Sequence, residues 1–220
     1  MGVGKSVNTI LFTLTHTFTH PTKALVSYEP LDWNIFFDRR EMIEDVVPIY
    51  FAGTSGHVFV CMHGAGHSAL SFAALARYLK QSSIVAAFDF RGHGGHYCEN
   101  EEDLSEETLI RDSIKAIRYV SSVYPDQSII IVGHSMGGSI ATKTVDFIMK
   151  EHSTETISKQ IQGLFVIDVV EGSAMDALPF MENIVTSRPT EFKSLAAVVA
   201  YGVKSGTIKD LESARVSMPD

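Results

Sequence analysis

From residue 57 onward, short apolar runs alternate along the chain with segments whose apolar residues are spaced as on one face of a helix. A short, continuous apolar run is typical of a strand buried on both faces, whereas helical spacing is typical of an amphipathic helix. The runs predict strands at residues 57–63, 83–90, 128–133 and 161–168. The spacing predicts helices at residues 68–80, 105–120 and 139–150.

This alternation predicts an α/β fold, with a mostly parallel sheet covered by helices on both faces. After Gly172 the pattern changes to helical spacing without a further strand, and helix-breaking residues interrupt it at Pro179, Pro189 and Gly206. Helices there would lie over the strand ends as a cap. We therefore expect a poorly ordered, variable leader at 1–30, a core at 31–171 and a helical cap segment at 172–220.

Composition narrows the class of protein. The 220 residues are 45% hydrophobic and 20% charged, as in a globular domain that can bury a core. The net charge of −8 argues against a nucleic-acid partner. The two cysteines, Cys61 and Cys98, form no disulfide or zinc pattern and favour a reducing compartment, the cytoplasm or nucleus, without a metal. No apolar run approaches the ~18 residues of a membrane span.

One strand-to-helix junction carries a chemical motif. Gly133-His134-Ser135-Met136-Gly137 fits the nucleophile elbow Gly-x-Ser-x-Gly, with a predicted strand before it and a predicted helix after it. The turn is sharp, so residues flanking the serine must be small. Ser135 is therefore the candidate nucleophile, and the N–H of Met136 can donate to an oxyanion that forms beside it.

A second loop can complete the oxyanion hole. His63-Gly64-Ala65-Gly66 follows the strand predicted at 57–63, where α/β-hydrolases place a His-Gly-rich loop. We assign the second oxyanion donor to the N–H of Ala65 and expect His63 to shape the loop through hydrogen bonds. An alternative interpretation is that Gly64, Gly66 and Ala69, with Asp89 further along the chain, form a dinucleotide-binding fingerprint. The match to the nucleophile elbow would then be a coincidence.

The candidate acid is Asp168, at the end of the strand predicted for 161–168. In this fold the triad follows the order serine, acid, histidine, and the acid orients the imidazole. Glu171 is a competing acid, and a helix-capping role is the structural alternative for Asp168.

Four stretches together closely resemble the protein phosphatase methylesterase family: HGAGHSALSF, GHSMGG, VIDVVEGSAMDAL and FKSL with VKSGTIKDLESARVSM. The resemblance implies an α/β-hydrolase fold and a serine esterase without a cofactor. It implies that the methyl ester is removed from the C-terminal leucine of the phosphatase 2A catalytic subunit, which is both substrate and protein partner. By the same resemblance, Ser135 is the nucleophile and Asp168 the triad acid.

The histidine of the triad is missing from this sequence. None of the nine histidines follows Asp168, whereas the family's catalytic histidine lies well downstream. We therefore expect a C-terminally truncated chain that lacks the last strands of its sheet as well as its base. One alternative is that a histidine at a strand end (His63, His67, His93 or His96) replaces the missing base. The others are that the chain is a non-catalytic phosphatase-binding protein, or a general carboxylesterase or lipase.

Overall fold

The computed structural model describes residues 26–168, 179 and 186–220. Their six strands form one sheet in the order β1-β2-β4-β3-β5-β6. In chain order the strands are β1 (Arg39–Ile43), β2 (Val47–Ala52), β3 (Val58–Met62), β4 (Ile84–Phe88), β5 (Ile129–His134) and β6 (Ile161–Ile167). Strands β4, β3, β5 and β6 are parallel neighbours, which agrees with the sheet predicted from the alternating pattern.

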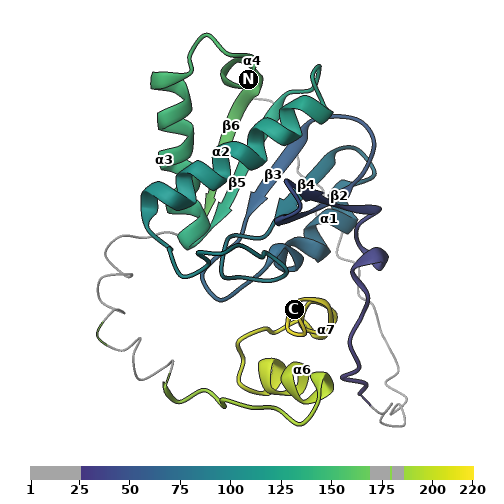
Figure 1. Cartoon of the computed structure of the whole chain (residues 1–220). Helices are drawn as coiled ribbons and strands as arrows, with labels where there is room; N and C mark the ends of the chain where they lie inside the picture. The colour runs from purple at the N-terminus through teal and green to yellow at the C-terminus, as the bar shows by residue number, and fades with distance from the viewer. Residues whose placement is uncertain (1–25, 169–178, 180–185) are drawn as a thin grey trace, which may run out of the picture.

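Helices cover both faces of the sheet (Figure 1). One core cluster packs α2 (Glu106–Val123), α3 (Met136–Glu151) and α4 (Thr156–Gln160) on one face. A second cluster, on the other face, contains η2 (Ala69–Phe72) and α1 (Ala73–Leu79). Strand β4 is buried along its whole length between them, which is why its sequence reads as a continuous apolar run.

The hairpin of β1 and β2 was not predicted. These strands pair antiparallel to each other, and β2 pairs antiparallel to β4. The hairpin turn places Glu44 (φ +51°) and Asp45 (φ +57°) in the left-handed region, where asparagine and glycine are the usual residues. The turn therefore lacks its usual sequence signal. The charged residues of β1 also obscure the strand pattern, although the Arg39 guanidinium packs 4.2 Å from the centre of the Phe51 ring on β2.

The predicted elements of the core are present with shifted boundaries. Each of the four strands predicted in the core occurs within two residues of its expected bounds. The helix predicted at 68–80 is divided into η2 and α1, while α3 begins at Met136, before the predicted start at 139. Residues 1–25, Glu171 and most of the early cap segment lie outside the described residues.

The cap helices are α6 (Leu195–Lys204) and α7 (Leu211–Ser217), and they lie below the sheet, at the end where the parallel strands finish (Figure 1). Arg77 of α1 forms two hydrogen bonds with the Glu212 carboxylate, at 2.7 and 2.5 Å. Ala214 and Val216 of α7 are buried. These contacts attach the cap helices to the core through α7.

Strand β6 lies at one edge of the sheet (Figure 1). It pairs with β5 along one side, and no other described strand pairs with its outer side. Its last three side chains remain exposed although they are apolar: Phe165 (58%), Val166 (44%) and Ile167 (45%). The part of the chain that the structure describes contains no helix long and apolar enough to cross a membrane.

Candidate active site

Ser135 occupies a sharp turn between β5 and α3. Its backbone has φ +52° and ψ −120°, a strained conformation for a residue with a side chain. The turn is fixed on both sides, since the Ser135 N–H donates to Ile167 O (2.9 Å) and the N–H of Gly138 donates to Ser135 O (2.8 Å). The side chain is exposed at the N-terminus of α3. This is the geometry that the elbow motif predicts.

The flanking glycines leave no room for larger residues. A Cβ at Gly133 would lie 2.4 Å from Gly137 O. A Cβ at Gly137 would lie 2.3 Å from Met62 O, in the backbone of the neighbouring strand β3. Both distances are far below normal van der Waals contact, and the obstructing atoms are backbone. Glycine is therefore required on each side of Ser135 for the turn to pack against β3.

The loop after β3 lies directly against the elbow. A Cβ at Gly64 would lie 3.2 Å from Ser135 Cβ, so the two backbones approach closely there. Ala65, the next residue, is exposed on the same side of the sheet as Ser135. The Met136 N–H lies in the first turn of α3, where N–H groups have no intrahelical acceptor. The assignment of Ala65 and Met136 to an oxyanion hole remains a prediction that this arrangement allows.

His63 joins the loops that follow β3 and β4. Its side chain is fully buried, its Nε2 accepts a hydrogen bond from the Phe90 N–H (3.0 Å), and its Nδ1 lies 2.8 Å from Gly64 O. Nδ1 must then carry the proton and donate it, which leaves the ring neutral. Burial lowers the pKa of His63 to about 3. Both ring nitrogens are engaged, so His63 shapes the loops and does not act as the missing base.

Asp89 is a second buried residue that binds the loops at this end of the sheet. One carboxylate oxygen accepts the Ala69 N–H (2.7 Å) and the other accepts the Gly95 N–H (3.0 Å). The side chain is fully buried, and burial raises the pKa of Asp89 to about 6. Asp89 thus ties η2 to the loop after β4. These hydrogen bonds give Asp89 a structural role, whereas the dinucleotide alternative would need this carboxylate free for a ribose.

As the pH falls, the buried side chains of Asp89 and His63 change the stability of the fold in opposite directions. The pKa of Asp89 is raised from 3.8 to about 6, so its ionisation destabilises the fold increasingly between about pH 4 and 6, by roughly 3 kcal/mol in all. The pKa of His63 is lowered from 6.5 to about 3, so acidification to pH 4 lowers the free energy of unfolding by roughly 3 kcal/mol. The two effects nearly cancel in the unmodified chain.

Asp89→Asn should remove this compensation. Between pH 7 and 4 the variant is expected to lose about 3 kcal/mol more stability than the unmodified chain, measured by urea unfolding at each pH. Asp126→Asn, in an exposed turn, is the matched control and should follow the unmodified chain. Parallel stability curves for Asp89→Asn and the unmodified chain would contradict the raised pKa.

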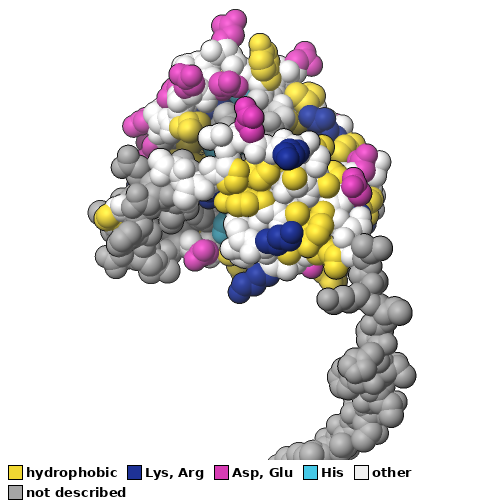
Figure 2. Space-filling view, turned by 90° about the horizontal axis from the view of Figure 1, so that it is seen from below, with side chains coloured by type: hydrophobic (Ala, Val, Ile, Leu, Met, Phe, Trp, Pro, Cys, Tyr) yellow, Lys and Arg dark blue, Asp and Glu magenta, His cyan; other side chains and the backbone are white. Residues whose placement is uncertain are grey.

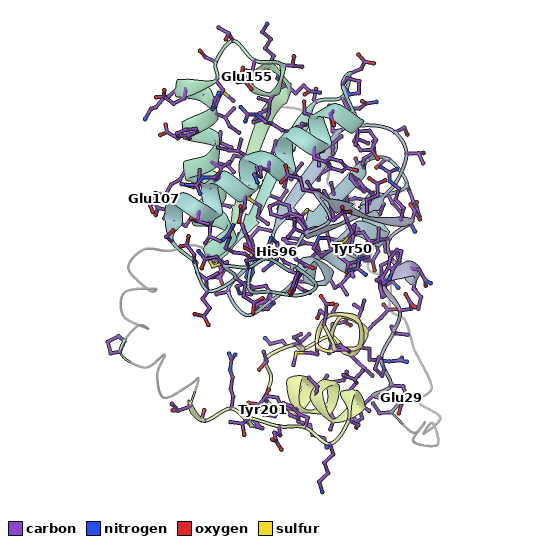
Figure 3. All side chains as sticks on the ribbon, in the orientation of Figure 1. Glu29, Tyr50, His96, Glu107, Glu155 and Tyr201 are labelled. Carbon is purple, nitrogen blue, oxygen red and sulfur yellow. The ribbon has the colours of Figure 1, made fainter. Side chains whose placement is uncertain are left out.

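The remaining histidines at the strand ends do not hydrogen-bond to Ser135. Within the described residues, the Ser135 hydroxyl forms no hydrogen bond. Burial lowers the pKa of His67, and the nearby Arg188 guanidinium lowers it further. The Nδ1 of His67 lies 3.4 Å from Ser71 Oγ. His93 Nδ1 lies 2.9 Å from Arg91 O, and His96 is buried among the strand-end loops (Figure 3).

Asp168 lies at the same sheet end as Ser135. It directly follows Ile167, whose carbonyl accepts the Ser135 N–H, and its backbone has φ +54°. Its side chain is exposed and makes no hydrogen bond with a described residue. The structure thus brings the predicted nucleophile and acid to one place, without an imidazole between them among the described residues.

Three cavities separate the strand ends from the cap helices, and all three are lined by His67. Their volumes are about 180, 520 and 260 Å³. The largest also contacts His134 and Ile167, the neighbours of Ser135 and Asp168 in the chain. Seen from below, the molecule shows patches of apolar side chains with a few lysines and arginines among other polar groups, and acidic side chains toward the rim (Figure 2). No described cluster of His, Cys, Asp or Glu could hold a metal ion.

Two long-range contacts at this end of the sheet were not predicted from the sequence. Arg91 pairs with Asp112 of α2 at 2.5 Å, and Arg188 reaches the loop after β3 from the cap segment. Both contacts join segments far apart in the chain, so no local pattern of residues could have indicated them. Arg188 is one of several charged residues in the segment 172–220, so its charge alone did not distinguish it.

The strand order, the elbow at the end of β5 and the glycine loop after β3 define an α/β-hydrolase. Solved structures share this fold: E-2-(acetamidomethylene)succinate hydrolase has a TM-score of 0.61 at 24% identity, covering 80% of this chain and 61% of its own. An esterase of M. tuberculosis has a TM-score of 0.58 at 18% identity, covering 80% and 57%. The family described as serine aminopeptidase S33 matches residues 54–164, and the chain belongs to this family.

Curated relatives confirm the resemblance to the protein phosphatase methylesterases. Protein phosphatase methylesterase 1 of Bos taurus is 39% identical over 200 residues, covering 87% of this chain and 50% of the relative. A probable protein phosphatase methylesterase 1 of Caenorhabditis elegans is 42% identical over 194 residues, covering 86% and 51%. The chain spans about half the length of these relatives.

Proposed function

We propose that this chain carries the nucleophile, the oxyanion hole and the acid of a serine esterase that hydrolyses a methyl ester. The observation that carries the proposal is the strained, exposed Ser135 at the N-terminus of α3, packed against the Gly64 loop. In this reaction Ser135 Oγ attacks the ester carbonyl while the N–H groups of Met136 and Ala65 stabilise the oxyanion. Methanol leaves, and water then releases the acid from Ser135.

Turnover requires a base that accepts the Ser135 proton. Asp168 follows Ile167, whose carbonyl accepts the Ser135 N–H, and this position supports a role for Asp168 in orienting an imidazole near the hydroxyl. Loss of the base in a serine hydrolase reduces turnover by about 10⁶-fold. We therefore propose that the described residues bind and position the ester, and that fast hydrolysis needs an imidazole in addition to them.

The names of the relatives support a protein substrate, a phosphatase. The family resemblance makes this substrate the C-terminal leucine methyl ester of the phosphatase 2A catalytic subunit. It implies a phosphatase partner that docks near the cap helices, a reaction without a cofactor, and a location in the cytoplasm or nucleus. A second candidate, a non-catalytic phosphatase-binding protein, is favoured by one observation: the Ser135 hydroxyl has no hydrogen-bonded imidazole among the described residues.

A fluorophosphonate probe separates the two candidates. If Ser135 is an esterase nucleophile, the 220-residue chain should be labelled slowly, and Ser135→Ala should abolish the label. Ser139→Ala, one turn into α3 and exposed, is the matched control and should be labelled as the unmodified chain is. Absence of Ser135 labelling, with capture of the phosphatase by the chain, would instead establish the non-catalytic binder. Labelling that survives in Ser135→Ala would contradict the assigned nucleophile.

A further inference from the structure

A groove, here called the helix groove, runs between α2 and α3, which lie beside each other on one face of the sheet (Figure 1). Its volume is about 460 Å³. Helix α2 lines it from Glu107 to Arg118, eleven residues apart and therefore about 16 Å along the helix axis. None of its lining residues lines a cavity at the strand ends, so the helix groove is separate from the candidate active site.

Apolar side chains form the floor of the helix groove. Ile110 and Ile114 lie one turn apart on α2, and Phe147 lines the same groove from α3. Phe147 is 42% exposed, and its ring packs against that of His152 with the centroids 5.5 Å apart. An exposed aromatic ring that is held beside isoleucines offers a fixed apolar contact to a partner, as hydrophobic grooves that bind amphipathic helices do.

A row of cations accompanies the apolar floor. Arg111, Lys115 and Arg118 are four and three residues apart, so they project from the same side of α2. Glu107, at the N-terminal end of α2 (Figure 3), is the one carboxylate among the described residues that line the groove. The excess of cations is local, because the whole chain has a net charge of −8. The helix groove is therefore complementary in charge to an acidic partner.

The cations of this row are available to a partner. Lys115 pairs with Glu44 and Arg118 pairs with Glu155, each at 3.0 Å, and all four side chains are more than 40% exposed. Exposed ion pairs contribute little to stability, so another carboxylate can replace Glu44 or Glu155 at small cost. Arg111 is exposed and forms no ion pair or hydrogen bond with a described residue. A carboxylate that binds Arg111 therefore displaces no existing partner.

We propose that the helix groove docks an acidic amphipathic helix of a protein partner, with its apolar face on the groove floor and its carboxylates against Arg111 and Lys115. Such a helix presents apolar and acidic rows with the same three- and four-residue spacing as the rows of α2. Its acidic residues lie toward Arg118, because Glu107 repels carboxylates at the other end of the groove. The inference goes beyond the proposed function and does not depend on it, since the helix groove shares no residue with the candidate active site.

The test is binding of three fluorescein-labelled, alanine-rich peptides of about 16 residues, long enough to form an isolated helix. The first carries leucines on one helical face and glutamates beside them, the second has glutamine for every glutamate, and the third is a scrambled form of the first. Fluorescence anisotropy with the 220-residue chain should give about tenfold tighter binding of the first peptide than of either other peptide. Arg111→Gln should weaken binding of the first peptide about fivefold and leave the second unchanged, whereas Phe147→Ala should weaken both.

Lys159→Gln is the matched control, because Lys159 is an exposed cation of α4, on the same side of the sheet, that does not line the helix groove. It should bind the three peptides as the unmodified chain does. Equal binding of the three peptides, a failure of the first to bind, or equal effects of Lys159→Gln and Arg111→Gln would overturn the proposal. Displacement of the first peptide by polyglutamate or by phosphatidylserine vesicles at matched charge would also overturn it, because the groove would then bind any anion or a membrane surface.

Discussion

Gly137→Ala is expected to lower the stability of the chain by about 3 kcal/mol, with a fall in the melting temperature of roughly 6–12 °C. The added Cβ would lie 2.3 Å from Met62 O and 2.5 Å from His63 O. Both obstructing atoms belong to the backbone of β3 and its following loop, in the centre of a parallel sheet. Neither can move without breaking the pairing of β3 with β4 and β5.

The same substitution should also displace Ser135. The first turn of α3 would have to move away from β3, and the gap between the elbow and the Gly64 loop would widen. Fluorophosphonate labelling of Ser135 should therefore fall even at temperatures where the variant remains folded. Thermal unfolding followed by circular dichroism, together with labelling at 10 °C below the transition, measures the two effects.

Gly163→Ala is the control for this prediction. Gly163 lies in β6, where an added Cβ would meet only the Ile130 side chain, at 3.6 Å, an ordinary contact distance. Its stability should change by less than about 1 kcal/mol. If both variants unfold alike, glycine is needed throughout this sheet for a reason other than close backbone approach. If neither variant is destabilised, the elbow does not pack as closely against β3 as described above.

Phe165→Lys is expected to reduce self-association of the 220-residue chain by roughly tenfold or more in the association constant. Strand β6 has an outer side that pairs with no described strand, and its sequence Ile161–Ile167 contains neither a charge nor a proline. Three consecutive exposed apolar residues lie on this strand, whose outer backbone groups pair with no described strand. Edges with these properties pair with other copies, and a lysine on the edge opposes such pairing.

Sedimentation velocity over a range of concentrations measures this effect. Phe147→Lys is the matched control, because Phe147 is an exposed aromatic residue (42%) on α3, away from the strand edge. The control should associate as the unmodified chain does. Equal effects of the two substitutions would show that general surface hydrophobicity drives association, and a monomeric unmodified chain would rule out edge pairing.

The parallel part of the fold was predictable because its signals are local. Strand β4 lies between two helical layers, so every residue is buried and the sequence reads as a single apolar run. Helix α2 shows its buried face through the spacing of Ile114, Ile117 and Val120. The hairpin of β1 and β2 was not predictable, since its charged residues have partners remote in the chain, such as the Tyr124 hydroxyl that accepts a hydrogen bond from Arg39 (3.0 Å).

The candidate site likewise contains features that were predictable from the sequence and features that were not. The sequence by itself determined the elbow and its loop, because strain and close approach demand glycine at Gly133, Gly137 and Gly64, and that demand is visible in the letters. Only the tertiary structure decided what each titratable group does. His63 is neutral and Asp89 joins η2 to the loop after β4 because both side chains are buried there. Burial and long-range partners arise from the packing of distant segments, and no short pattern of residues encodes them.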